Sequence, residues 1–349
     1  MKVLLTCSSS SRTGPVEGLI SLASYAREQG IDARFGGDTV RPGEDLDAHL
    51  ARAGVPWERE LRLSRKVRLR DVVHDARALP KLGFDLVHAA MAHDHLLALW
   101  SGAKVVRAVQ RRADARRLWP LRRSDAVIVH ATRVQELLEA AAIPVTLVPG
   151  SVDAGRFTPG PSTLRARWGV PAEAPLAGIV ARMKPERGHR ELLRAFAAHA
   201  PRDAWLVLVG RGEDEAELRR LAGERVVFGG YARGEELVDA YRALDAAVWL
   251  REGNDGACRG VLEAMACGVP VVAGAEGAQA DYVEDEVSGL LVDPADPVRI
   301  GEALRRLLGD LGAARAMGRE ARLRAEQFPP QRAHAATLAV WRSICGTDG

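Results

Sequence analysis

The chain has 349 residues, of which 47% are hydrophobic and 27% are charged. This length suits two domains rather than one hydrophobic core, and the composition excludes an intrinsically disordered chain. No stretch of the sequence reaches the roughly 18 apolar residues needed to span a bilayer, and the first apolar segment is too short for a signal peptide. We therefore expect a cytoplasmic protein.

The four cysteines are scattered and form no CxxC pair: Cys7, Cys258, Cys267 and Cys345. Cytosolic thiols are usually reduced, so the sequence predicts neither a disulfide framework nor a zinc site.

The net charge of +3 is unevenly distributed, because residues 59–123 contain 16 Lys or Arg against 6 Asp or Glu. Such a stretch favours an anionic partner such as an acidic lipid, a phosphorylated glycan or a nucleic acid. The alternative is an ordinary solvated surface in an arginine-rich protein, since only 5 of the 49 basic residues are lysines. Charge patterning alone leaves both interpretations open.

Apolar runs alternate with amphipathic segments through the first half of the sequence. A buried strand is predicted at Lys2–Cys7 and a helix at Val16–Gln29, which Gly30 ends. Further strands are predicted at Leu86–His88, Val105–Val109, Ala126–Val129 and Thr146–Val148, and a helix at Ala131–Ala141. This alternation predicts a parallel, doubly wound α/β sheet.

Proline and glycine are dense between residues 149 and 169, which marks a linker, so we assign residues 1–160 to a first domain. The alternation then restarts and predicts a second Rossmann-like domain over residues 161–328. Its predicted strands are Leu176–Val180, Trp205–Val209, Val226–Phe228, Ala246–Trp249 and Val269–Ala273. Its predicted helices are Arg190–Ala198, Glu213–Ala222, Glu235–Leu244, Arg259–Ala266, Val298–Leu308 and Ala313–Glu326. Two prolines then redirect the chain into a last helix within residues 329–349.

Ligands of open α/β sheets bind at the carboxyl ends of the strands, which draws attention to two loops. The first follows Leu176–Val180 and contains Arg182, Lys184 and Arg187 just before a helix. Cations at a helix N-terminus, where backbone N–H groups are free, favour a diphosphate. The alternative is a solvated basic loop.

The second loop follows Ala246–Trp249 and contains two glycines, which permit a tight backbone near a ligand. Asp255 lies in this loop, and Glu263 lies about two turns into the following helix. Two carboxylates so placed would bind separate hydroxyl groups of one extended ligand. The alternatives are a helix cap for Asp255 and a structural helix carboxylate for Glu263.

Residues 255–272, DGACRGVLEAMACGVPVV, closely resemble the signature of the retaining GT-B glycosyltransferases of family 4, the glycosyl transferases group 1. Residues 181–188 (ARMKPERG) resemble the family's Gly-Arg-x-x-x-x-Lys-Gly loop. Residues 148–157 (VPGSVDAGRF) resemble its interdomain segment, and residues 85–88 (DLVH) a motif of its first domain. The four matches follow the family's order and cover most of the chain, more loosely in the first half.

The resemblance implies two Rossmann-like domains facing a central cleft, with the C-terminal helix, residues 329–349, returning to the first domain. The first domain would bind the acceptor and the second the nucleotide sugar. The implied catalytic residues are Arg182 and Arg187 on the donor diphosphate, Glu263 on the ribose hydroxyls, and Asp255 on the transferred sugar. The other implied donor-binding residues are Gly14 near the phosphates, Tyr231 near the base, and the amides of Gly256, Ala257 and Cys258 near the sugar.

Five features depart from the family pattern. They are Arg187 in place of Lys, Asp255 in place of Glu, Gly150-Ser151 in place of Asn-Gly, Gln110 in place of a His near the reacting sugar, and an N-terminal SSSSRTG loop without the usual Gly-Gly pair. Gln hydrogen-bonds but does not titrate, and Arg prefers a bidentate fork to the point charge of Lys. These changes affect the expected specificity more than the expected fold.

His93-Asp94-His95 superficially suggests a metal site, but residues two apart on a helix do not share a face, so no metal is predicted. His88, His93, His95 and Gln110 are instead candidates for the acceptor side, with a surface role as the alternative for the histidines. Residues 45–47 imitate the Asp-x-Asp of metal-dependent transferases, but they fall in the acceptor half, and we assign them no role.

The sequence contains neither a Ser-His-Asp or Cys-His set nor a dehydrogenase-type GxGxxG after its first strand. In sugar transfer, preorganised cations stabilise the charge that develops on the leaving nucleoside diphosphate. We expect Arg182 and Arg187 to do so without a metal or cofactor. The resemblance implies retention of anomeric configuration, and the donor would be a UDP-sugar or, as a second choice, a GDP-sugar.

The implied acceptor is a glycan or lipid-linked molecule of the cell-envelope polysaccharide or lipopolysaccharide type. The basic stretch 59–123 would then lie against an anionic membrane surface as a peripheral contact on its cytoplasmic face, and no nucleic acid is expected. Two alternatives stay open: a nucleotide-sugar epimerase or phosphorylase on the same fold, and a non-catalytic nucleotide-sugar-binding subunit.

Overall fold

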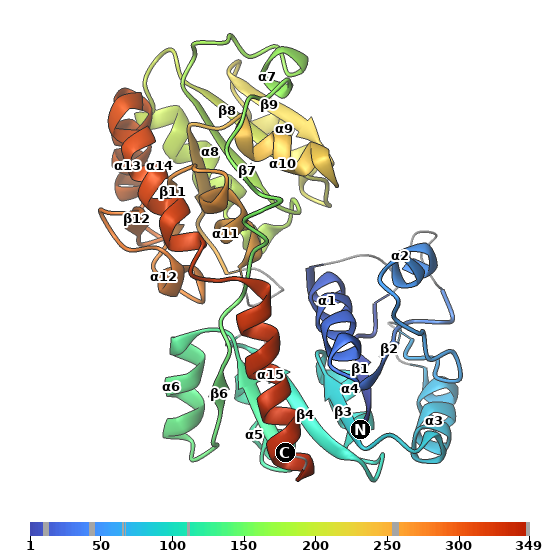
Figure 1. Ribbon diagram of the computed structural model, residues 1–349. Helices are drawn as coiled ribbons and strands as arrows, with labels where there is room; N and C mark the ends of the chain where they lie inside the picture. The colour runs from blue at the N-terminus through green and yellow to red at the C-terminus, as the bar shows by residue number, and fades with distance from the viewer. Residues whose placement is uncertain are drawn as a thin grey trace. The chain divides into compact units, whose positions relative to one another are not determined.

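The computed structural model describes residues 1–9, 14–41, 46–64, 66, 68–109, 112–252 and 258–346. The chain forms two compact units. Unit one contains residues 1–149 and 331–349, and unit two contains residues 150–330. Figure 1 shows a parallel sheet with helices packed around it in each unit.

In the described part of unit one, six parallel strands form a sheet in the order β2-β1-β3-β4-β5-β6. The strands are β1 (Lys2–Thr6), β2 (Asp32–Gly36), β3 (Leu86–Ala89), β4 (Lys104–Val109), β5 (Ala126–Val129) and β6 (Thr146–Leu147). The helices are α1 (Gly14–Glu28), α2 (Leu46–Arg52), α3 (Leu69–Ala78), α4 (Ala92–Ala98), α5 (Leu118–Leu121), α6 (Thr132–Ala140) and α15 (Pro330–Cys345), with 3₁₀ turns η1 (Leu79–Leu82) and η2 (Asp114–Arg116).

Both faces of this sheet are covered, as the alternation within β1 shows. Val3 and Leu5 belong to an apolar cluster that includes residues of α1, α2 and α15. Leu4, between them, belongs to a second cluster, with residues of α3, η1 and α4. Successive side chains of a strand point to opposite faces, so β1 is buried on both sides, which is typical of a parallel sheet. The predicted strands and the doubly wound arrangement are confirmed.

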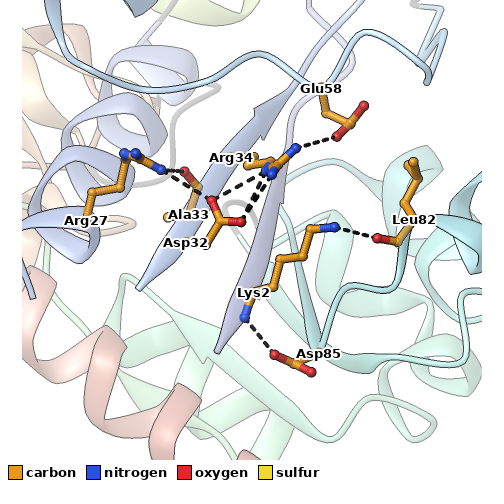
Figure 2. Close-up of polar contacts among 8 residues, drawn as sticks. All are labelled: Lys2, Arg27, Asp32, Ala33, Arg34, Glu58, Leu82 and Asp85. Carbon is orange, nitrogen blue, oxygen red and sulfur yellow. Dashed lines mark hydrogen bonds and ion pairs between the residues drawn. The ribbon is translucent and has the colours of Figure 1, made fainter. Parts of the chain in front are cut away.

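The edge strand β2 is missing from the strands that the sequence pattern predicts. Two of its five side chains are charged: Asp32 and Arg34 form an ion pair with an N–O distance of 3.2 Å. Arg27 and Glu58 extend this pair into a small network, with N–O distances of 3.3 and 3.5 Å (Figure 2). Charged side chains protect a sheet edge from further pairing, but they also interrupt the apolar run by which a strand is recognised.

The C-terminal helix α15, red in Figure 1, packs into the core of unit one. Trp341 is fully buried there, and Leu338 is almost so. The Trp341 indole N–H donates to Nδ1 of His88 in β3 over 3.2 Å. The last helix thus contributes to the same core as β1 and β3, and the return of this helix to the first domain is confirmed.

In the described part of unit two, six strands form a sheet in the order β12-β11-β10-β7-β8-β9. The strands are β7 (Leu176–Val180), β8 (Trp205–Val209), β9 (Val226–Gly230), β10 (Ala246–Trp249), β11 (Val271–Gly274) and β12 (Gly289–Val292). The helices are α7 (Leu164–Arg167), α8 (His189–His199), α9 (Glu215–Leu221), α10 (Glu235–Arg242), α11 (Arg259–Ala266), α12 (Gln279–Tyr282), α13 (Pro297–Gly309) and α14 (Leu311–Ala325), with a 3₁₀ turn η3 (Pro185–Arg187).

The central strands of unit two are also buried on both faces, whereas the edge strand β9 is only half-buried. Val248 in β10 packs with residues of α8, α13 and α14, whereas its neighbour Trp249 lies against Tyr241 of α10, with ring centroids 6.1 Å apart. Every predicted strand and helix of this half is present within a few residues of its expected bounds. The sequence pattern predicts neither β12 nor the helices α7 and α12, which are single turns.

Across the described ranges, no helix combines the length and apolar character needed to cross a membrane.

Candidate functional site

The sheet order of unit two brings two loops together. From β7 the chain proceeds outward through β8 and β9, and it then returns to pair β10 on the other side of β7. Ligands of open α/β sheets bind where the strand order reverses in this way, at the carboxyl ends of the strands. A Cβ atom built on Gly188, at the end of the β7 loop, would lie 2.9 Å from Cβ of Leu250, which begins the β10 loop. The two loops are therefore in contact.

The β7 loop carries the cations that the sequence predicts. Arg182 is exposed, and Arg187 is half-buried in the turn η3 just before α8. The buried Nε of Arg187 has no hydrogen-bond partner among the described residues. Lys184 forms a long ion pair with Glu213, with an N–O distance of 3.9 Å. This loop therefore places three basic side chains and one acidic one, Glu186, near the start of a helix, and the net positive charge favours an anion.

Two glycines of the β8 loop, Gly210 and Gly212, pack against the backbone of the β7 loop. Neither was predicted as a site residue. A Cβ on Gly210 would lie 2.0 Å from the carbonyl oxygen of Ala181, and one on Gly212 would lie 1.9 Å from that of Met183. The Met183 N–H donates to the Arg211 carbonyl over 3.1 Å. The Gly-x-Gly sequence after β8 could have predicted this contact, because glycines permit two backbones to approach closely.

Glu263 lies in α11 and is 7% exposed. Its Oε2 accepts a 2.8 Å hydrogen bond from the hydroxyl of Tyr241, and its Oε1 lies 3.4 Å from a guanidinium nitrogen of Arg259. Burial, together with the Glu263 charge, raises the pKa of Tyr241 well above its ordinary value, so the hydroxyl stays a donor. The Tyr241 ring is held between Phe157 and Trp249, with centroids 6.0 and 6.1 Å away. Tyr241 was not found from the sequence, where it is an ordinary apolar position of a helix.

The loop that precedes α11 is only partly described. Asp255, Gly256 and Ala257 lie outside the described residues, and Cys258 is buried at the start of the helix. Cys258 has φ of 43°, a left-handed conformation that non-glycine residues rarely adopt. Such a conformation persists only where the surroundings impose it, and it is frequent at ligand-binding loops.

The two further donor-side candidates, Tyr231 and Gly14, belong to different units. Tyr231 follows the last residue of β9 and is 56% exposed. Gly14 is the first residue of α1 and therefore belongs to unit one. Gly14 stays a prediction as a phosphate-binding residue.

The acceptor-side candidates all belong to unit one. His88 is buried in β3 and accepts from Trp341, and its pKa is lowered to about 3, mainly by burial. His95 is buried in α4, with Nε2 2.7 Å from the Ser124 hydroxyl, and burial lowers its pKa to about 4. His93 is half-buried, and Gln110 lies outside the described residues.

Asp94, between the two histidines, makes a contact that the sequence analysis missed. It is 1% exposed, and its Oδ2 accepts the backbone N–H of Ser8 over 2.8 Å. Ser8 follows β1 and Asp94 follows β3, the neighbouring strands at which the order of this sheet reverses. Burial raises the pKa of Asp94 to about 6. Within the residues that the structure describes, no group of three His, Cys, Asp or Glu side chains is placed to hold a metal ion.

Residues 162–324, which include the β7 loop and α11, match the family model of glycosyl transferases group 1. Unit two therefore contains a glycosyl transferases group 1 domain. The match covers most of unit two, where the sequence motifs are closest to the family pattern.

Relatives of the family are similar mainly over part of their length. The D-inositol 3-phosphate glycosyltransferase of Saccharomonospora viridis is 36% identical over 231 residues, which are 61% of this chain and 53% of that protein. The GDP-mannose-dependent alpha-mannosyltransferase of Mycobacterium tuberculosis is 36% identical over 174 residues, which are 49% of this chain and 44% of that protein. The chain thus spans about half the length of these curated relatives.

Solved structures resemble the whole chain. Anabaena HepE, in a crystal with UDP and glucose, has a TM-score of 0.83 at 20% identity, covering 98% of this chain and 100% of that one. Sucrose-phosphate synthase from Thermosynechococcus elongatus has a TM-score of 0.82 at 21% identity, covering 99% of this chain and 100% of that one. The two Rossmann-like sheets and the C-terminal helix are therefore those of the GT-B fold.

Proposed function

We propose that this protein is a retaining glycosyltransferase that transfers a sugar from a nucleoside-diphosphate sugar to a hydroxyl of an acceptor. The observation that carries the proposal is the reversal of strand order in unit two. It joins the basic β7 loop to the β10 loop, which leads into α11 and Glu263. A basic loop near a buried carboxylate suits one extended ligand that carries both a diphosphate and sugar hydroxyls.

Each part of this set has a proposed role. Arg182 and Arg187 bind the diphosphate and stabilise the negative charge that grows on it as the anomeric bond breaks. Glu263 accepts hydrogen bonds from the ribose hydroxyls, with its carboxylate held by Tyr241. Asp255 and the amides at the start of α11, including that of Cys258, bind the transferred sugar. The departing phosphate takes up the proton of the acceptor hydroxyl, which attacks from the same face.

The donor is proposed to be a UDP-sugar, with a GDP-sugar as the second choice. The crystal of Anabaena HepE contains UDP and glucose, whereas the mycobacterial relative is described as GDP-mannose-dependent. Tyr231, exposed beside the end of β9, is proposed to contact the base.

The acceptor is proposed to bind to unit one and to carry negative charge. The relatives act by name on D-inositol 3-phosphate and on a phosphatidylinositol monomannoside, and a further solved structure is a lipopolysaccharide galactosyltransferase. The 16 basic residues of 59–123 suit an anionic acceptor of this kind, either free or at the cytoplasmic face of a membrane.

The test has two stages. A panel of UDP- and GDP-sugars is first screened by thermal shift, because a ligand that binds only the native state raises its melting temperature. The stabilising donor is then incubated with candidate acceptors, and NMR of the product gives the anomeric configuration. Transfer with retention, lost in Glu263→Ala, supports the proposal.

Three other results would point elsewhere. Conversion of the donor sugar without acceptor indicates an epimerase, and release of a sugar phosphate that depends on inorganic phosphate indicates a phosphorylase. Donor binding without turnover over the whole acceptor panel indicates a non-catalytic subunit. An inverted product contradicts the retaining mechanism.

A further inference from the structure

Unit one contains a polar cavity with a volume of about 630 Å³. This size lies within the range of about 300–1,000 Å³ that is common for small-molecule sites. The charged and titratable side chains that line it are Arg59, Glu60, Arg62, Arg70, Asp71 and His74. None of them was selected individually in the sequence, although all belong to the basic stretch 59–123.

The cavity lies at the carboxyl end of β2. Thr39, which also lines it, follows the end of this strand by three residues. The Thr39 N–H donates to the Arg62 carbonyl over 3.0 Å, and its hydroxyl donates to the Leu61 carbonyl over 2.8 Å. The segment that carries Arg62 is thus fixed beside the end of the edge strand β2, on the carboxyl-end side of the sheet.

Arg62 is held in place by two buried carboxylates of α3. Its guanidinium donates to Asp71 Oδ1 over 2.9 Å, and the Asp71 side chain is only 3% exposed. Asp75 accepts the backbone N–H groups of Arg62 and Leu63 over 2.7 and 2.9 Å. A guanidinium has five donors in a rigid fork, so one fixed to a buried carboxylate still has donors for a ligand.

Two more arginines, Arg59 and Arg70, line the cavity. Arg70 lies on the same face of α3 as His74, four residues later, and its side chain is 68% exposed. Arg59, whose side chain is 61% exposed, lies over the ring of Trp57, with its guanidinium carbon 4.7 Å from the centroid. Arg59 forms an ion pair with Asp47 of α2, and Arg62 and Arg70 both contact Asp71, so each of the three guanidinium groups has one carboxylate partner and further donors that remain for a ligand.

We infer that this cavity binds a phosphate group, as part of a phosphorylated sugar or polyol. Arginine suits this ligand because its planar fork matches two phosphate oxygens at once. The carboxylate of Glu60 and the hydroxyl of Thr39 would take hydrogen bonds with the hydroxyls of the same molecule. The assignment of this phosphate to the acceptor rests on the proposed function, whereas the affinity of the cavity for phosphate does not.

The experiment measures the thermal shift and calorimetric affinity of the full chain for inorganic phosphate, at constant ionic strength adjusted with sodium chloride. The variant Arg59→Ala/Arg70→Ala removes two exposed arginines of the cavity. The matched control Arg52→Ala/Arg77→Ala removes the same charge from exposed positions of α2 and α3 that do not line it. The inference predicts affinity about tenfold lower in the first variant and unchanged in the control.

The variant Arg182→Ala identifies the competing location, because the β7 loop is also expected to bind phosphate. Phosphate binding that is lost in Arg182→Ala and kept in the cavity variant overturns the inference, as does equal binding by all variants or binding by none. If the double variant does not fold, Arg70→Gln, at a largely exposed side chain, replaces it. A parallel UDP titration of the cavity variant, in which only the donor site is intact, reports on that site, so failure of the proposed function is seen separately.

A vesicle assay distinguishes the two sources of the phosphate. The protein is sedimented with phosphatidylcholine vesicles that contain phosphatidic acid, and with phosphatidylcholine alone. Binding to the former that is lost in Arg59→Ala/Arg70→Ala assigns the cavity to a lipid headgroup. Phosphate binding without sedimentation assigns it to a soluble sugar or polyol phosphate.

Discussion

The hydroxyl of Tyr241 donates a 2.8 Å hydrogen bond to Oε2 of Glu263, in a region where both side chains are largely buried. This hydrogen bond fixes the orientation of the Glu263 carboxylate, although Tyr241 lies outside the sequence motif. In the proposed reaction Glu263 meets the ribose of the donor, so Tyr241 is a positioning residue for donor binding.

Replacing Tyr241 by Phe should weaken donor binding while leaving the chemical step largely intact. We expect the KM for the donor to rise about tenfold and kcat to change much less, because the lost hydrogen bond orients a ligand-binding group. The free energy of unfolding should fall by about 1–3 kcal/mol, the cost of a buried acceptor without its donor. Steady-state kinetics and urea unfolding measure these effects. Tyr25→Phe, in unit one, is the control, and equal kinetic losses in both variants would contradict the positioning role.

Replacing Arg182 or Arg187 by Ala should lower turnover by about 10²–10³-fold. This is the usual cost of removing one preorganised group that stabilises transition-state charge. The control is Arg202→Ala, an exposed arginine before β8, at the amino end of the strand. Transfer is measured as release of the nucleoside diphosphate. Near-normal turnover in both variants would exclude Arg182 and Arg187 from the diphosphate site.

The backbone contact beneath the β7 loop should not tolerate a side chain. Gly210→Ala places a Cβ 2.0 Å from the Ala181 carbonyl oxygen, so the loops that follow β7 and β8 must move apart. We expect a loss of about 2 kcal/mol or more in the free energy of unfolding, and weaker donor binding. Gly223→Ala is the control, since a Cβ there meets no atom within 4 Å. A Gly210→Ala protein with full stability and donor affinity would show that the contact is unimportant.

Unit one should lose stability as the pH falls below about 6.5. The pKa of His88 is lowered to about 3 by burial and by the nearby His130 and Arg107, so the unfolded chain binds a proton that the native state excludes. His88 alone should cost about 2 kcal/mol between pH 6.5 and pH 5. Asp94 acts in the opposite sense, because its pKa is raised to about 6 and its protonation favours the native state as the pH falls from 6 to 3.8.

The variant His88→Asn isolates the histidine contribution, since the Asn oxygen can still accept from Trp341. Hydrogen exchange of the amides of β3 and α15 at pH 7 and pH 5 measures the local free energy of opening. The wild type should lose more protection at pH 5 than His88→Asn. The same pH dependence in both proteins would show that His88 does not carry the effect.

The sequence by itself determined ten of the twelve strands that the structure describes and the alternation of strands and helices in both halves. Strands such as Leu176–Val180 and helices such as Arg259–Ala266 follow from local apolar runs and from periodicity, which need only neighbouring residues. The basic β7 loop and the position of Glu263 are likewise local patterns, and they suffice to suggest a nucleotide-sugar site. The strand β2 was not predicted, because the charged side chains of Asp32 and Arg34 interrupt its apolar run.

Only the tertiary structure decided which groups meet. Tyr241 and Glu263 are 22 residues apart, and Ser8 and Asp94 are 86 apart. Arg62 faces a cavity because Asp71 and Asp75 of a separate helix hold its segment. Such contacts depend on how strands are ordered in a sheet and on which helix faces pack against it. These are long-range outcomes of burying apolar surface, and local periodicity does not encode them.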